Sequence, residues 1–182
     1  MILPIVGYGH SVLRIKTNDI DNSYPNIQQL IDDMFETMYN ANGVGLAAPQ
    51  INLSISVLVI DANPFKEDYP EGEGFKRAMI NPEILETNGE DEKFEEGCLS
   101  LPGINEVVIR KNKVKVRYFD EKFEEHIEEL YGIRARVFQH EFDHLNGKVF
   151  TDRLSNMRRA FLKKKLNDIA NNKVHPAYKM IK

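Results

Sequence analysis

Apolar residues recur at helical spacing in two stretches of the chain. From residue 25 to residue 40 they fall three or four positions apart and would form one face of a helix, and the pair Asn42-Gly43 would end it. The members of this face are Ile27, Leu30, Ile31, Met34, Phe35 and Met38. A second stretch, from Ile133 to Asn146, has the same spacing, with Gly132 before it and Gly147 after it. The pattern predicts a helix in each stretch.

Runs of apolar and β-branched residues between these helices predict strands near residues 53–60, 78–85, 106–109, 114–119 and 125–130. The segment 62–76 is rich in proline, glycine and acidic residues, which is typical of a surface loop. An amphipathic stretch over 156–169 predicts a C-terminal helix, followed by an irregular tail after residue 171. The order helix, strands, helix, helix predicts an α+β fold, with mainly antiparallel sheets around the central second helix.

The composition fits one intracellular domain over residues 1–182. A chain of 182 residues with 42% hydrophobic residues can bury a single sizeable core, and it has no apolar run of the roughly eighteen residues that a membrane span needs. The first residues lack the charged and apolar regions of a signal peptide. One cysteine excludes an internal disulfide framework and fits a reducing compartment. We therefore expect a cytoplasmic protein without membrane contact.

Charge is distributed unevenly. Residues 153–182 carry nine Lys or Arg against Asp168 alone, whereas the chain as a whole has a net charge of −4. The cations of the predicted terminal helix lie opposite an apolar face made of Met157, Phe161, Leu162 and Leu166. The cations are Arg158, Arg159, Lys163, Lys164 and Lys165. This helix is either a solvated helix that packs on the body of the protein or a surface that contacts the phosphates of an RNA.

The second predicted helix contains the motif HExxH, from His140 to His144. Positions i and i+4 of a helix lie on one face, so both imidazoles can bind one metal ion while Glu141 stays beside it. Zinc, ferrous iron, cobalt and nickel all accept such ligands, but two imidazoles make an incomplete site. The pattern predicts a metal hydrolase that takes a third ligand from elsewhere in the chain.

The third ligand is sought first downstream, where zinc proteases with HExxH carry a His or a distant Glu. The extended form of the motif requires His at position 150, and this chain has Phe150. The upstream candidate is Cys98, the single cysteine of the chain. A lone cysteine is commonly a small buried apolar residue. Its neighbours Gly97 and Ser100 favour an exposed turn instead, in which the thiol would be available as a ligand.

Three segments resemble the signature motifs of the peptide deformylases, in the order and spacing of that family. They are Gly43-Val44-Gly45-Leu46-Ala47-Ala48-Pro49-Gln50, Glu96-Gly97-Cys98-Leu99-Ser100 and Gln139-His140-Glu141-Phe142-Asp143-His144. The resemblance covers about residues 2–167. It implies an enzyme that removes the formyl group from the N-terminal formyl-methionine of new bacterial or organellar proteins and releases formate. It also implies Fe2+ as the native metal, and Zn2+, Ni2+ or Co2+ would fit the same ligands.

The resemblance implies a role for each motif residue. Cys98, His140 and His144 would bind the metal and leave a fourth position open, as catalytic metals require. The metal would lower the pKa of a water and supply hydroxide for attack on the formyl carbon, with Glu141 as general base and acid. The Gln50 side chain and the backbone N–H of Leu99 would bind the oxyanion.

Substrate contacts follow from the same comparison. The backbone at Gly45 would bond to the peptide, and pairing of main chains would make recognition tolerant of sequence beyond the first residue. Gly97 is also expected to contact the substrate. An apolar pocket would hold the methionine side chain, and four residues are candidates for its wall by their match to the family: Val44, Phe94, Ile133 and Val137. Ordinary core packing is the alternative for each of them.

The expected partners are formyl-methionyl nascent peptides and the ribosome. The ribosome would be bound through RNA near the exit tunnel by the basic terminal helix, and no DNA is expected. Arg110 follows an apolar strand, and a pair with Glu96 would hold the Cys98 loop. Two other functions stay open. The first is an HExxH metallopeptidase that cleaves internal peptide bonds, and the second is a catalytically inactive, ribosome-associated binding protein.

Overall fold

The computed structural model describes residues 1–181 and contains a five-stranded antiparallel sheet, in the order β2-β3-β4-β5-β6. Its strands are β2 (Gly45–Ala47), β3 (Val57–Asp61), β4 (Lys76–Gly97), β5 (Asn105–Phe119) and β6 (Glu125–Tyr131). A small parallel sheet pairs β1 (Ile5–Val6) with β7 (Met180–Ile181). The helices are α1 (Ile27–Asn40), α2 (Gly132–Leu145) and α3 (Asn156–Ala170). The predicted α+β fold with an antiparallel sheet and a C-terminal helix is confirmed.

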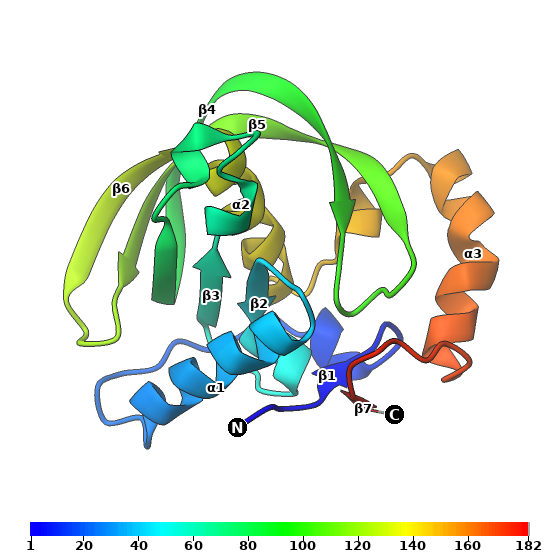
Figure 1. Ribbon diagram of the computed structural model, residues 1–182, viewed down its shortest axis with the longest axis horizontal. Helices are drawn as coiled ribbons and strands as arrows, with labels where there is room; N and C mark the ends of the chain where they lie inside the picture. Colours follow the sequence, from blue (N-terminus) through cyan, green and yellow to red (C-terminus); the bar gives the residue numbers. More distant parts are fainter. Residues whose placement is uncertain (182) are drawn as a thin grey trace.

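Helix α2 lies in the middle of the molecule, and β4 and β5 arch over it (Figure 1). Strand β3 is buried on both faces because its side chains alternate between two cores. Leu58 and Ile60 pack with α2, whereas Val57 and Val59 pack with the apolar face of α1. The helix with the HExxH motif is thus enclosed by sheet, and its polar side chains must find partners inside the protein.

The hairpin of β4 and β5 is longer than the sequence pattern predicts. The separate strands expected near 78–85, 106–109 and 114–119 join into two continuous strands, with register shifts between Asn88 and Asp91 and at two further places. Residues 86–95 are mostly charged and exposed, so they carry no apolar signal, but their backbone still pairs with β5. Along β5 the even-numbered residues face inward, among them Val108 and Arg110. This alternation turns a charged residue toward α2.

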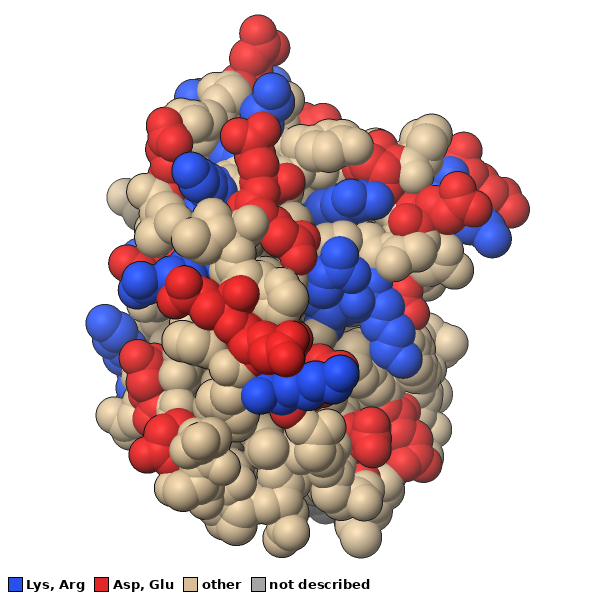
Figure 2. All heavy atoms as spheres, turned by 90° about the vertical axis from the view of Figure 1, so that its left-hand side faces the viewer, with Lys and Arg blue, Asp and Glu red and all other residues tan. Residues whose placement is uncertain are grey.

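The side of the molecule with β6 carries both signs of charge. Acidic and basic side chains intermingle on this face, which lies opposite α3, and no patch of one sign forms there (Figures 1 and 2). Arg117 of β5 pairs with Glu83 of β4 at 2.5 Å, and Lys115 lies opposite Glu129 of β6 in the sheet register. The five cations that the sequence analysis assigns to the terminal helix lie in α3.

Helix α3 packs on the body through fewer apolar residues than predicted. Leu162, Leu166 and Ile169 are buried against Leu101, Ile104 and neighbouring residues. Met157 and Phe161, which the sequence analysis assigns to the packed face, are each 72% exposed. This part of the prediction is wrong because Met157 and Phe161 lie on another side of α3 from Leu162, Leu166 and Ile169, which face the body.

The tail after α3 is also more regular than predicted. After Asn171 the chain turns back and ends in β7, whose register pairs Met180 with Ile5 and Ile181 with Val6. A two-residue strand with a parallel partner far away in the sequence has no local pattern that would predict it. Among the described residues, no helix is both long enough and apolar enough to cross a membrane.

Candidate metal centre and active site

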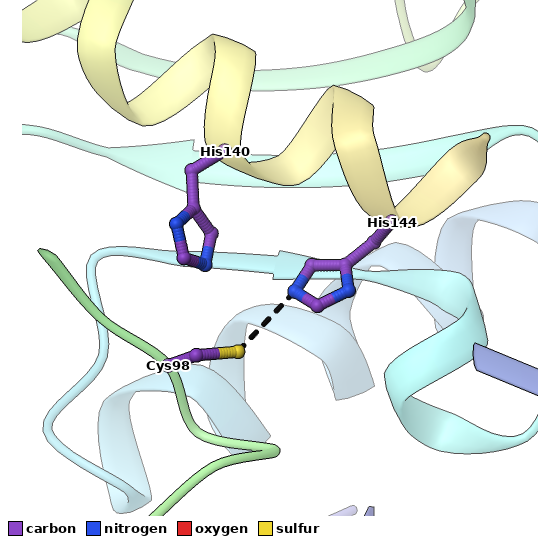
Figure 3. A group of neighbouring side chains, drawn as sticks. All are labelled: Cys98, His140 and His144. Carbon is purple, nitrogen blue, oxygen red and sulfur yellow. Dashed lines mark hydrogen bonds between the residues drawn. The ribbon is translucent and has the colours of Figure 1, made fainter. Parts of the chain in front are cut away.

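Three ligand atoms meet at the end of β4. Helix α2 presents His140 and His144 from successive turns, with ring centroids 5.3 Å apart, and both rings point toward Cys98 just after β4 (Figure 3). The Cys98 Sγ atom lies 3.3 Å from Nε2 of His144. One ligand atom from each of the three residues lies within 4.8 Å of the others. The structure therefore brings together the three residues that the sequence predicts as metal ligands.

The charge state and the hydrogen bonds of these residues suit a metal ion. Burial by itself raises the pKa of the Cys98 thiol, but the neighbouring His144 and His140 outweigh it and lower that pKa to about 5. The thiolate, which is the form that binds metals, is thereby favoured. Nδ1 of His140 lies 2.9 Å from a carboxylate oxygen of Glu96, which leaves Nε2 of the same ring for a ligand. One thiolate and two imidazoles are a donor set for zinc or ferrous iron.

Glu141 lies beside the three ligands without a bond to any of them. Its side chain is buried, and its Oε2 atom has no hydrogen-bond partner among the described residues. Burial raises the pKa of Glu141 to about 7, against the opposing effect of the two histidines. A carboxylate with a pKa near neutrality can both accept and return a proton at physiological pH. An unpartnered buried oxygen at this place fits a site that receives a water or a substrate group.

Gly45 has a steric reason to be glycine that the sequence analysis missed. A Cβ atom at this position would lie 2.4 Å from Oε1 of Glu141 and 2.8 Å from its Cγ and Cδ atoms. The carboxylate of Glu141 therefore packs directly on the backbone of β2. Any side chain at Gly45 would displace the group that is the candidate base.

The amide of Gln50 is oriented by the backbone of its own turn. Its Oε1 atom accepts from the N–H of Ala47 at 2.9 Å, so the NH₂ group faces the other way. There Nε2 donates to Oγ of Ser100 at 3.2 Å and lies 3.6 Å from Sγ of Cys98. The turn predicted around Cys98 is exposed only in part: Gly97 is exposed, Cys98 and Leu99 are half-buried, and Ser100 is fully buried. Ser100 faces inward because its hydroxyl finds its partner in Gln50.

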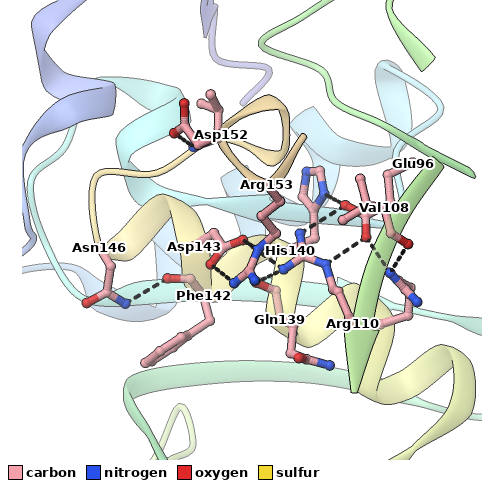
Figure 4. Close-up of polar contacts among 12 residues, drawn as sticks. Glu96, Val108, Arg110, Gln139, His140, Phe142, Asp143, Asn146, Asp152 and Arg153 are labelled. Carbon is pink, nitrogen blue, oxygen red and sulfur yellow. Dashed lines mark hydrogen bonds and ion pairs between the residues drawn. The ribbon is translucent and has the colours of Figure 1, made fainter. Parts of the chain in front are cut away.

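A buried network of charges supports the ligands from behind (Figure 4). The guanidinium of Arg110 binds both oxygens of Glu96, at 2.7 and 2.9 Å, and donates to Asp143 at 2.7 Å. Arg136 donates to Glu96 at 2.9 Å, and Arg153 binds Asp143 through two bonds. The predicted pair of Arg110 with Glu96 is confirmed. The network links the Cys98 loop to the helix that carries both histidines.

The network also fixes the charge of its carboxylates. Burial alone raises the pKa of Glu96, but hydrogen bonds from Arg110 and His140 outweigh it, and the net pKa lies far below its usual range. For Asp143, burial is likewise outweighed by Arg153 and Arg110, and its pKa is lowered. Both groups are therefore ionised. An ionised Glu96 holds the His140 ring in the orientation that a ligand needs.

A cavity of about 500 Å³ opens onto two of the three candidate ligands, Cys98 and His140. Its wall includes most of the predicted substrate residues, namely Val44, Gly45, Phe94, Gly97 and Val137, together with Gln50, Leu99, His140 and Glu141. Ile133 does not line it. The Ile133 side chain is 2% exposed and packs in the core between α2 and the sheet. Of the two roles considered for Ile133, the methionine pocket and core packing, the structure supports core packing. Position 133 lies on the same side of α2 as His140 and His144 but about two to three turns before them, at the other end of the helix.

Several wall residues were absent from the predicted set. Phe65 comes from the loop between β3 and β4, and its ring lies edge-on to Phe94 at 6.2 Å. Pro176 and Tyr178 come from the tail after α3. The spacing of the sequence contains no signal for these residues, because each reaches the cavity through tertiary packing. The aromatic residues of the loop 62–76 were the one available hint.

Comparison with known proteins agrees with this geometry. A sequence profile of the family described as "Polypeptide deformylase" matches residues 2–160, which include all three motifs. The chain belongs to the peptide deformylase family. It is 46% identical to the peptide deformylase of Christiangramia forsetii, over 99% of this chain and 95% of that protein. It is 48% identical to the peptide deformylase of Flavobacterium johnsoniae, with the same coverage.

Solved structures of peptide deformylases have the same fold. The structure from Ehrlichia chaffeensis superposes with a TM-score of 0.84 at 36% identity and covers 95% of this chain and 99% of its own. The structure from Thermus thermophilus gives a TM-score of 0.83 at 40% identity, with coverages of 94% and 99%. Peptide deformylases are metal-dependent hydrolases that remove the N-formyl group from nascent peptides. The resemblance drawn from the three motifs is confirmed.

Proposed function

We propose that this chain hydrolyses the formyl group of N-terminal formyl-methionine, with Cys98, His140 and His144 as ligands of one divalent metal. The observation that carries the proposal is the position of Glu141, which lines the same cavity as Cys98 and His140 and has a buried oxygen free of partners among the described residues. When it is bound, the metal supplies a Lewis acid that brings the pKa of a water toward neutrality. The remaining chemistry belongs to the residues of the chain.

Glu141 accepts a proton from the attacking water and returns it to the leaving amine. The new bond forms between the water oxygen and the formyl carbon, the amide C–N bond breaks, and formate and a free amino terminus result. The raised pKa of Glu141, about 7 because of its burial, suits both transfers. The oriented NH₂ group of Gln50 and the N–H of Leu99 bind the oxyanion that develops on the formyl oxygen. Both residues line the cavity.

Peptide recognition is proposed at the open edge of β2. The carbonyl of Val44 accepts from Asp61, so in an antiparallel ladder the main-chain groups of Gly45 point away from β3. An extended peptide that adds to this edge would bind through its backbone and would keep its own side chains outside the pairing. The apolar walls formed by Val44, Phe94 and Val137 would hold the methionine side chain.

We propose Fe2+ as the native metal, with Zn2+, Ni2+ and Co2+ as ions that the same ligands accept. We further propose a single catalytic domain over residues 1–182 and the cytoplasm as its compartment, where formylated nascent chains arise. The ribosome is proposed as a partner through α3. Of its five cations, Arg158 binds Glu106 at 2.6 and 2.9 Å, so the cations that remain for RNA are Arg159, Lys163, Lys164 and Lys165.

The test compares two peptides with the metal-loaded protein under anaerobic conditions. Formyl-Met-Ala should release formate, and an unformylated oligopeptide should stay intact. Glu141→Ala should bind metal at unchanged stoichiometry and lose at least about a hundredfold in rate, since proton transfer by a placed side chain contributes about 10²–10⁴. Cleavage inside the unformylated peptide would favour a metallopeptidase, and near-normal activity of the metal-loaded Glu141→Ala protein would remove Glu141 from the mechanism.

A further inference from the structure

The tail after α3 reaches the wall of the active-site cavity. It leaves the helix at Ala170, passes the cavity at Pro176 and Tyr178, and then pairs with β1, where the N–H of Ile5 donates to the carbonyl of Lys179 at 2.8 Å. Tyr178 is half-buried, and its hydroxyl donates to the carbonyl of Leu99 at 2.6 Å. A residue 79 positions away in the sequence thus binds the loop that follows the ligand Cys98.

This hydrogen bond completes a set of three on successive carbonyls. The carbonyl of Cys98 accepts from the N–H of Leu101 at 2.9 Å, and the carbonyl of Ser100 accepts from the N–H of Tyr8 at 2.8 Å. The carbonyl between them is the one that Tyr178 holds. Each carbonyl fixes a peptide plane, because the bonds of the peptide unit are coplanar. The planes on both sides of Leu99 are therefore held, the first by the loop itself and the second by the tail.

We propose that Tyr178 is a positioning residue for the reaction, and this inference rests on the proposed function. Its hydroxyl holds the peptide plane after Leu99 and so restrains the backbone rotation at Leu99, the residue whose N–H is directed at the oxyanion. Its ring, which lines the cavity, contacts the bound peptide. The hydroxyl acts on the chemical step through Leu99, and the ring acts on peptide binding.

The attachment of the tail does not depend on this hydroxyl. Strand β7 pairs with β1 independently, and the Met180 side chain packs on the backbone of Gly7, 2.8 Å from the point where a Cβ would lie. Removal of the hydroxyl should therefore leave the tail in place. This separation allows a kinetic effect of Tyr178 to be distinguished from a loss of folding.

The experiment compares Tyr178→Phe and Tyr178→Ala with the parent protein, all loaded with the same metal. A matched control is Tyr118→Phe, which also removes a tyrosine hydroxyl bond, that to Glu128 at 2.5 Å, at a site outside the cavity wall. Tyr178→Phe should lower kcat on formyl-Met-Ala-Ser by about three- to tenfold with KM nearly unchanged, the effect of one neutral hydrogen bond. Tyr178→Ala should lower kcat similarly and also raise KM. Tyr118→Phe should leave both constants unchanged.

A second measurement does not depend on turnover. Amide hydrogen exchange followed by NMR should be faster at Leu99 and Ser100 in Tyr178→Phe than in the parent, and unchanged at these positions in Tyr118→Phe. A kcat of Tyr178→Phe equal to that of the parent, or unaltered exchange at Leu99, would overturn the inference. A parent protein that carries stoichiometric metal and cleaves no formyl-peptide would instead refute the proposed function, and the positioning role would be refuted with it.

Discussion

Replacement of Arg110 by Met should destabilise the protein by about 3 kcal/mol, the lower end of the cost of breaking a buried ion pair. Methionine keeps an unbranched apolar stem and removes the charged guanidinium. The Arg110 side chain has no exposed area, and the side chains of its partners Glu96 and Asp143 are 4% and 7% exposed. The variant therefore leaves two buried carboxylates that each lack one cation.

The surrounding contacts place the magnitude at the lower end of that range, which extends from about 3 to about 5 kcal/mol. Glu96 keeps its bonds from Arg136 and His140, and Asp143 keeps two bonds from Arg153. Neither carboxylate is left without a partner. For a chain of this size, each kcal/mol lowers Tm by about 2–4 °C, so the expected loss is about 6–12 °C.

The assay is urea denaturation of the metal-free protein at pH 7, with Arg117→Met as the matched control. Arg117 lies on the same strand and forms one ion pair with Glu83, but both side chains are about half exposed. Exposed pairs contribute about 0–1 kcal/mol, so the control should stay near the parent. Metal affinity should also fall by about tenfold or more in Arg110→Met, because Glu96 orients His140 less firmly.

Equal losses of the free energy of unfolding in Arg110→Met and Arg117→Met would show that the buried ion pairs of Arg110 contribute no more than an exposed pair. Arg110→Met could also lose free energy of unfolding without any change in metal affinity. In that case the network would stabilise the fold but would not orient the ligands.

The remaining predictions concern the ligands, β2 and α3. Cys98→Ala should lose the metal, whereas Cys98→Asp should keep part of it because a carboxylate also binds metals. Metal analysis after dialysis measures both, and an unchanged metal stoichiometry in Cys98→Ala would exclude Cys98 as a ligand. Gly45→Ala should lose most deformylation, since the new Cβ would lie 2.4 Å from Oε1 of Glu141, and parental kcat and KM would contradict this. A variant with four cations of α3 replaced by Gln should cleave short formyl-peptides normally. It should bind ribosomes more weakly, and the salt dependence of this binding should be flatter. Co-sedimentation with ribosomes equal to that of the parent across a salt series would show that this helix is only a solvated surface. The four cations are Arg159, Lys163, Lys164 and Lys165, and Arg158 is left in place because its loss would leave Glu106, which is 9% exposed, without its ion pair.

The ligands on α2 are a case in which local sequence is sufficient. The spacing of His140 and His144 places both on one face of any helix, and the apolar positions around them predict that helix. The sequence also identifies Cys98 as a candidate, because it is the single cysteine and Phe150 occupies the downstream position. These features depend on residue type and short-range geometry, which a sequence contains directly.

The parts that the sequence did not predict depend on contacts between distant segments. Ile133 has the same local character as Val137, and only the packing of α2 sends the first into the core and the second to the cavity wall. Met157 and Phe161 were assigned to the packed face of α3, yet they lie on another side of the helix from the residues that contact the body. A pattern states which residues can be buried, and the shape of the partner surface decides which of them are.

The charged residues show the same division. The sequence contains Arg110, Glu96 and Asp143 without indicating that they enter the core, because a charge is normally solvated unless a partner is at hand. The tertiary structure brings strand β5, the Cys98 loop and α2 together, and each charge then finds its partner. Tyr178 reaches Leu99 through β7, a strand of two residues that exists only by pairing with β1. The sequence by itself determined the candidate ligands and the candidate base of this site, whereas the support behind them was decided by tertiary structure, because buried polar groups are stable only where the fold supplies their partners.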